Sequence, residues 1–310
     1  MAIQIPALLE SHLALPPQTS QIVLTGVLGA STNWLVLRYL YSLLQIQSGS
    51  VSGSGLSGNT TLGTSDNNQS AKHDVSVVFV SFLRDYGFWK DGAGRLGLNL
   101  DNLTAQNKFS FVDGLTRLFS RSTGGSAPGS AFARPAVVSS DAAAAAAPKR
   151  GGLIFLESPR IADVARTINA AIQKQQQQQR RVVLVLDQPD MLLAAAGAGD
   201  GVTSGSLRDL VLDLREEVHA TIITLAADEP LVASQTTTLE KEHAAFLLSI
   251  AHEAEAMLSL RLLDTGTAKD VSGVVRATRG GASLNQTIEE HEYLYYVGGD
   301  GGVKVFERGQ

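Results

Sequence analysis

A strand, a glycine-containing turn and a helix follow one another over residues 21–44, and this order has the shape of a phosphate-binding loop. Residues 22–24 form a short apolar run with β-branched side chains, which predicts a buried strand. The turn that follows contains Gly26 and Gly29. An apolar run of helical character then opens near residues 31–32, where either hydroxyl side chain is a suitable cap. Units of this kind bind phosphate groups in many proteins.

The chemistry of a phosphate-binding loop is missing from this unit. A working P-loop has the form GxxxxGK[ST], and counting from Gly26 places Ser31 at the second glycine, Thr32 at the lysine and Asn33 at the hydroxyl residue. The cation for the β- and γ-phosphates and the Mg²⁺-binding hydroxyl are therefore absent. Because phosphoryl transfer depends on positioning and charge stabilisation, we expect an NTPase-like scaffold that does not hydrolyse nucleotide. A plain strand-to-helix turn is the simpler alternative.

Composition excludes several classes of protein. The 310-residue chain is 44% hydrophobic, which is enough for a sizeable core. It has no cysteine, which excludes disulfides, thiol catalysis and cysteine-ligated zinc. The formal net charge of -5 gives no global field that attracts nucleic acid. No apolar run of about 18 residues occurs, so no membrane span is expected. The six histidines lack zinc spacing, and neither a metal nor a cofactor is expected.

Strand-like and helix-like segments alternate along most of the chain. Near-continuous apolar runs are typical of parallel strands buried on both faces. After residue 239 a helix precedes segments that predict antiparallel strands, with Gly298–Gly302 as a hairpin turn. This order predicts one RecA-like α/β domain over residues 1–310, with a mostly parallel sheet flanked by helices. The expected strands are 21–25, 75–82, 152–157, 181–187 and 219–226, and the expected helices are 32–46, 110–120, 159–176, 206–218 and 239–254.

Two stretches contain few large apolar residues and are expected to be flexible insertions on the surface of that domain. Residues 48–70 are rich in Ser, Gly, Asn and Thr. Residues 120–150 begin with a Ser/Gly-rich segment and include a run of alanines. A third loop, Gly197–Gly205, follows the strand at 181–187 and takes the place of a pore loop in RecA-like rings.

Asp187 is a second residue with a counterpart in NTPases. It is the last residue of the apolar strand at 181–187, as a Walker-B aspartate is. Hydrolysis in this class also needs a glutamate just past the second strand, expected at 75–82, and Asp85 is the only carboxylate there. The lysine, the hydroxyl and the glutamate are all missing, so Asp187 is interpreted as structural. The alternative is a divergent ATPase in which Asp187 acts with residues of a neighbouring subunit.

Two segments carry a family resemblance. The first is VVFVSFLRDYGFWKDGAGRLGLNL, which includes Arg95–Leu98, and the second is KFSFVDGLTRLF, which includes Phe109–Leu115. Both resemble the Elongator complex protein 6 family, and the Phe-Val-Asp-Gly-Leu block is the most specific part. The resemblance covers about residues 15–265 apart from the two insertions, which are of the kind expanded in filamentous fungi.

The resemblance implies a RecA-like fold without working Walker motifs and a non-catalytic part in a heterohexameric ring with Elongator proteins 4 and 5. Such a ring binds tRNA and docks on the larger Elongator subunits, which modify the wobble uridine. The resemblance also implies location in the cytoplasm and the nucleus. A stand-alone regulatory binding module is a further alternative.

Candidate contact residues follow from composition. Phe82 and Phe111 are expected in the core, whereas Phe88 and Trp89 lie in an expected loop and are candidates for a subunit interface. Asp113, before a glycine, is interpreted as a turn or cap residue. The candidates for RNA contact are Arg208, Arg276 and Arg279.

Overall fold

A computed structural model gives the architecture of the chain. Both expected insertions, 48–70 and 120–150, lie outside the described residues. The structure describes residues 5–45, 75–118, 153–196, 198–264, 266, 268–282 and 288–308.

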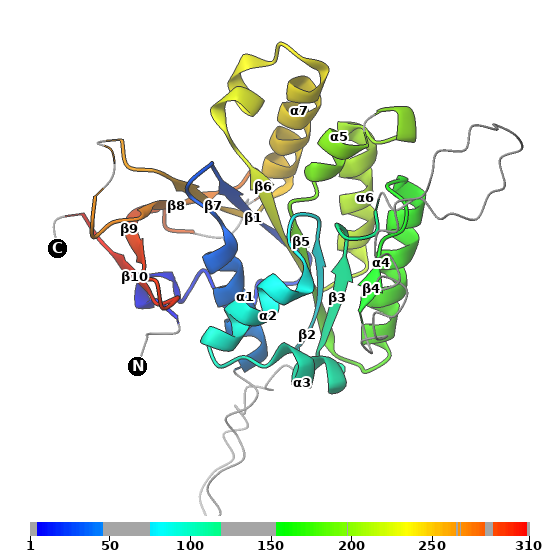
Figure 1. Cartoon of the computed structure of the whole chain (residues 1–310), viewed down its shortest axis with the longest axis horizontal. Helices are drawn as coiled ribbons and strands as arrows, with labels where there is room; N and C mark the ends of the chain where they lie inside the picture. Colours follow the sequence, from blue (N-terminus) through cyan, green and yellow to red (C-terminus); the bar gives the residue numbers. More distant parts are fainter. Residues whose placement is uncertain are drawn as a thin grey trace, which may run out of the picture.

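One sheet runs through the molecule, with its strands in the order β10-β9-β8-β7-β1-β6-β5-β2-β3-β4 (Figure 1). From β7 to β4 all neighbouring strands are parallel, and from β7 to β10 they are antiparallel. The strands are β1 (Ser20–Gly26), β2 (Val75–Ser81), β3 (Phe109–Asp113), β4 (Ile154–Phe155), β5 (Arg181–Asp187), β6 (Ala220–Ala226), β7 (Ala256–Arg261), β8 (Gly273–Arg279), β9 (His291–Val297) and β10 (Val303–Phe306). The expected parallel sheet with antiparallel C-terminal strands is confirmed.

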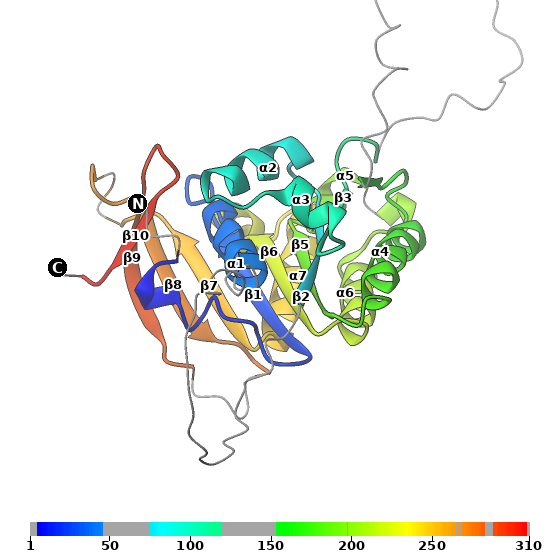
Figure 2. The same cartoon turned by 90° about the horizontal axis from the view of Figure 1, so that it is seen from below.

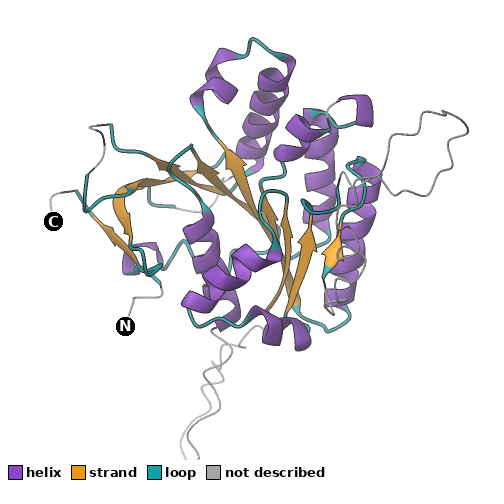
Figure 3. Ribbon diagram, in the orientation of Figure 1, coloured by secondary structure: helices purple, strands orange, loops and turns teal. Residues whose placement is uncertain are grey.

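Helices cover both faces of the parallel part (Figures 2 and 3). One face carries α1 (Asn33–Gln45), α2 (Tyr86–Arg95) and α3 (Leu100–Ala105). The other carries α4 (Ile161–Gln176), α5 (Met191–Ala195), α6 (Ser204–Glu216) and α7 (Thr238–Glu253). Shorter turns are η1 (Ala7–Leu9), η3 (Ala198–Asp200) and η4 (Pro230–Ser234). In the part of the chain that the structure describes, no helix has the length and apolar character to cross a membrane.

Alternation along the strands divides the core into two layers. In β5, Val183 and Val185 join the apolar cluster under α1, α2 and α3. Val182, Leu184 and Leu186 join the cluster under the helices of the opposite face. Successive side chains of a strand point to opposite faces, so an unbroken apolar run is what a strand between two helical layers requires.

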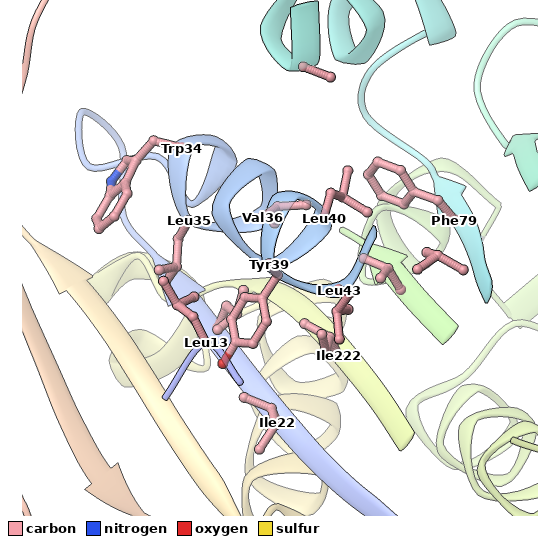
Figure 4. Close-up of a cluster of buried hydrophobic side chains, with 14 of the residues drawn as sticks. Leu13, Ile22, Trp34, Leu35, Val36, Tyr39, Leu40, Leu43, Phe79 and Ile222 are labelled. Carbon is pink, nitrogen blue, oxygen red and sulfur yellow. The ribbon is translucent and has the colours of Figure 1, made fainter. Parts of the chain in front are cut away.

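Helix α1 covers the centre of the sheet with one of its sides. Leu35, Tyr39 and Leu43 recur at four-residue intervals and point toward the strands (Figure 4). They belong to the same buried cluster as Ile22 of β1 and Ile222 of β6. This packing fixes the direction in which the chain leaves β1, and hence the place of the turn between β1 and α1.

The helix expected at 110–120 is wrong over all of its described residues, 110–118. Residues Phe109–Asp113 form strand β3, whose five residues are all buried. Periodicity does not separate a short apolar run in a strand from one in a helix, and pairing with β2 and β4 decides here. The remaining described residues, 114–118, form bends and a turn.

The loop expected around Phe88 is also wrong, because α2 covers residues 86–95. Asp85 caps this helix by accepting a hydrogen bond from the backbone N–H of Phe88. Three glycines lower the intrinsic helix propensity of α2, so the sequence pattern did not predict this helix. Burial of Trp89 against Phe79, with ring centroids 4.7 Å apart, holds the helix in place.

Trp89 and Phe88 offer a matched test of this packing. Trp89 is fully buried and its Nε1 lies 3.3 Å from the Ser81 hydroxyl, whereas 40% of Phe88 is exposed. We expect Trp89→Ala to lower the free energy of unfolding by about 3–5 kcal/mol. Phe88→Ala should lower it by about 1 kcal/mol or less. Urea unfolding followed by far-ultraviolet circular dichroism measures both, and equal losses would contradict the packing described.

Candidate functional site

The candidate site lies where the parallel strands end. In open α/β sheets, ligands bind outside the carboxyl ends of the strands. Here that edge contains the turn after β1, Asp187 at the end of β5, and the segments that follow β2 and β6. The degenerate P-loop residues and the Walker-B-like residue named from the sequence therefore lie at one edge of the sheet.

The turn after β1 is closed and short. The backbone N–H of Ala30 donates to the carbonyl oxygen of Val27 at 2.8 Å, and Gly29 has a φ of 92°, which favours glycine. A Cβ on Gly26 would lie 2.8 Å from the carbonyl oxygen of Ala30, so only glycine fits there. The two glycines thus serve a tight turn, in which the backbone folds onto itself and leaves no cradle for a phosphate chain.

A carboxylate of the same chain already binds this turn. The backbone N–H of Leu28 donates to Oδ1 of Asp228 at 2.7 Å, and the N–H of Ala227 donates to the carbonyl oxygen of Gly26 at 2.8 Å. Both partners follow β6, the neighbour of β1 in the sheet. A phosphate at this turn would compete with Asp228 for the N–H and would be repelled by its charge.

The residues at the second-glycine and lysine positions, Ser31 and Thr32, are also engaged within the fold. Thr32 is 3% exposed and its Cγ2 lies 3.2 Å from where a Cβ of Gly26 would be. The Ser31 hydroxyl accepts the backbone N–H of Asn33 at 3.2 Å, as a local cap. The side chain at the lysine position is therefore part of the core, and the serine before it completes the start of α1.

Asp187 connects three strands. It is 1% exposed, and its carboxylate accepts the hydroxyl of Ser81 from β2 at 2.7 Å and that of Thr224 from β6 at 2.9 Å. Burial raises the pKa of Asp187 above its ordinary value, against the opposing effect of these two hydrogen bonds and of the Arg84 charge. The geometry gives Asp187 a structural part, because its side chain joins β2, β5 and β6 at their carboxyl ends.

A second buried carboxyl group lies next to it, and sequence reasoning missed it. Asp190 accepts the backbone N–H of Ala226 at 3.2 Å and lies 3.8 Å from Nδ1 of His243. The other ring nitrogen of His243 lies 2.9 Å from the carbonyl oxygen of Ala226. Burial raises the pKa of Asp190 to about 6, although the His243 charge opposes this. Asp190 follows β5 and His243 lies on α7, far apart in the chain, so their spacing in the sequence hardly indicates that they meet.

These residues do not fit a Mg²⁺–nucleotide complex. The N–H of Leu28 is bound to a carboxylate, the lysine position is a buried threonine, and Asp187 is enclosed by two hydroxyls. Among the described residues, no group of three or more His, Asp or Glu side chains has the geometry to hold a metal ion.

Comparison with known proteins identifies the fold. No family model matches the sequence, and no curated protein matches it. A KaiC-like protein from the hyperthermophilic archaeon Pyrococcus horikoshii has a similar structure, with a TM-score of 0.55 over 99% of this chain and 98% of that one. The chain has a RecA-like fold. At 13% identity the likeness concerns the fold alone.

The two aromatic interface candidates differ in their exposure. Trp89 is fully buried on the inner side of α2, so the expectation that it contacts a partner is corrected. Phe88 is 40% exposed on the same helix and is accessible. The core positions expected for Phe82 and Phe111 are confirmed, at 3% and 1% exposure. Asp113 accepts the backbone N–H groups of the two residues after Gly114, as expected of a turn residue.

The structure does not bring the three candidate RNA-binding arginines together. Arg208 lies on α6 and pairs with Asp209 at 2.8 Å. Arg276 and Arg279 lie on β8, beyond β7 and β1 in the sheet. Figure 1 shows α6 and β8 on opposite sides of the molecule, so Arg208 does not form one basic patch with the other two arginines.

The buried Asp190 predicts a dependence of stability on pH. Its pKa is raised on folding, so its contribution to stability is complete below the unfolded value of about 4 and is lost as pH rises through about 6. Between about pH 4.5 and about pH 7.5 we expect the wild type to lose on the order of 2 kcal/mol relative to Asp190→Asn. Urea unfolding across this range measures the difference. The exposed Asp209→Asn control should track the wild type, and a constant gap between the wild type and Asp190→Asn would refute the prediction.

Proposed function

We propose that this chain is a non-catalytic RecA-like subunit of the Elongator accessory ring. In this proposal it assembles with Elongator proteins 4 and 5 into a heterohexamer that docks on the larger Elongator subunits. Its part is to complete the ring and its tRNA-binding surface, and thereby to support modification of wobble uridine in the cytoplasm and the nucleus.

The proposal that the chain is non-catalytic rests on the hydrogen bond between Asp228 and the turn after β1. The carboxylate holds the Leu28 N–H at 2.7 Å, at the position where this fold class receives a phosphate. This contact is built into the fold, because Asp228 follows the strand that pairs with β1 over its whole length. In this proposal the chain keeps the fold, but the groups at the position of the nucleotide site bind one another.

The family assignment is supported by the Phe109–Leu115 block. Gly114 has a structural reason to be glycine, since a Cβ there would lie 2.8 Å from the Phe82 ring. Asp113 before it binds the backbone of the turn that follows, through the N–H groups of Leu115 and Thr116. The block that carries the resemblance is therefore a compact element at the carboxyl edge of the sheet.

Exposed leucines at the same edge suit contact with a ring partner. Leu28 is 87% exposed at the tip of the closed turn, and Leu262 is 48% exposed just after β7. They are neighbours, because the Leu262 side chain lies 3.4 Å from the position of a Cβ on Gly29. An apolar tip at this place favours packing against another subunit.

Leu28 gives a test of this assembly. Co-expression with Elongator proteins 4 and 5 should yield a six-subunit species whose tRNA affinity falls when this chain is omitted. Leu28→Asp should weaken association roughly tenfold, a loss of about 1.4 kcal/mol, and so lower the assembled fraction, because a charge replaces an apolar side chain that the proposed assembly buries. Native mass spectrometry measures the fraction. Leu248→Asp, at a residue 53% exposed on α7, is the matched control and should assemble as the wild type does.

The alternative is a divergent ATPase that uses Asp187 with residues of a neighbour. If the chain stays monomeric in that co-expression and hydrolyses ATP in a manner that Asp187→Ala abolishes, the ring proposal fails and the ATPase takes its place.

A further inference from the structure

Two arginines lie in the segments that follow β2 and β3 at the carboxyl edge of the sheet. Ser81, Asp113 and Phe155 are in register across β2, β3 and β4, so the segments after these strands begin next to one another, about 5 Å apart. Arg84 lies in the segment after β2 and Arg117 in the segment after β3, and both side chains are exposed. This group lies beyond β5 from the closed turn at β1 and is separate from it.

Each of these arginines is held by an aromatic ring. The Arg84 guanidinium lies 5.1 Å from the centroid of the Phe88 ring, and that of Arg117 lies 4.0 Å from the centroid of the Phe155 ring. A guanidinium stacked in this way is held in place by one face and keeps its N–H groups free to bind anions.

The Arg84 charge acts on the buried Asp187 and lowers the pKa of that carboxyl, but neither arginine forms a direct ion pair with a described residue. Within the described ranges, no acidic side chain lies at ion-pair distance from Arg84 or Arg117, whereas Arg166, Arg208 and Arg261 each have such a partner. Three of the nearby acids are engaged elsewhere. Asp85 caps α2, Asp113 accepts the turn that follows β3, and Asp163 pairs with Arg166, while Glu157 is exposed.

A hollow of about 340 Å³ adjoins the Arg117–Phe155 stack. Phe155 forms part of its wall, and the polar side chains that line it are Glu157, Ser158, Asp163, Arg166 and Thr167. Its volume suits one small planar group. Phe88, 40% exposed, and Leu115, 44% exposed, add apolar surface beside the two arginines.

We propose that this edge, over β2, β3 and β4, binds unpaired nucleotides of an RNA. Arg84 and Arg117 bind successive phosphates, one base enters the hollow beside Phe155, and Phe88 stacks on a neighbouring base. Adjacent cations with interleaved aromatic surface are the general means of holding a single strand. The inference rests on the proposed tRNA-binding function and places the RNA contact on residues other than the three arginines named from the sequence.

The test uses the full chain and a fluorescently labelled oligouridylate of about ten nucleotides, followed by anisotropy. We expect the double variant Arg84→Gln/Arg117→Gln to bind roughly tenfold or more weakly. The dependence of log affinity on log salt should fall in slope by about 1.4, or about 0.7 for each lost phosphate contact. The matched control is Arg276→Gln/Arg279→Gln, which removes the same charge from exposed positions on β8 and should stay within about twofold of the wild type.

A second variant separates stacking from charge. Phe155→Leu keeps an apolar side chain and both cations but removes the ring. It should weaken binding roughly fivefold or more, because base stacking on the ring is lost, and leave the salt slope unchanged. Far-ultraviolet circular dichroism of each variant establishes that the fold is retained.

The outcomes separate this site from the ring proposal, because assembly with the partner subunits is measured independently by mass. Wild-type affinity in the Arg84/Arg117 double variant overturns the site even if the ring forms. A double variant that loses assembly but keeps RNA affinity also overturns it, because the edge is then a protein interface. Loss of oligonucleotide binding in a chain that never forms the ring supports the site and rejects the ring.

Discussion

The need to bury a parallel sheet on both faces is the constraint on which the rest of this structure depends. Strand β5 shows it most directly, since Val183 faces one layer of helices and Leu184 faces the other. Two helical layers leave only the ends of the sheet for polar chemistry. Asp187, Ser81 and Thr224 meet there because their strands pair in register, and they satisfy one another before any ligand is involved.

The carboxyl edge is therefore divided into three parts. Asp228 closes the turn after β1, and exposed Leu28 forms an apolar tip above it. Hydroxyl and carboxyl groups fill the middle, around Asp187. Stacked arginines occupy the far part, beginning with Arg84. An edge that binds nucleotide in a RecA-like enzyme is thereby available for contacts with macromolecules, which is the common element of both proposals.

Much of the framework followed from sequence pattern. The five parallel strands expected from apolar runs are present, and so are the helix after residue 237 and the Gly298–Gly302 turn. Two errors share one cause. The apolar pattern of β3 does not distinguish a strand from a helix, and the glycines of α2 lower its helix propensity. In both segments, contacts with residues distant in the sequence decide the secondary structure. Trp89 was misplaced for the same reason, because its neighbour Phe79 lies in another element.

The sequence by itself determined the fold class and the loss of the P-loop chemistry, because apolar periodicity and residue identity at fixed spacing are local properties of the chain. Only the tertiary structure decided what took the place of that chemistry. Asp228 reaches the Leu28 N–H across 200 residues of chain, and Asp190 meets His243 beneath the same edge. Arg117 stacks on Phe155 across the β3–β4 pair in the same way. These contacts depend on strand order and register, which bring together side chains that no spacing along the sequence relates.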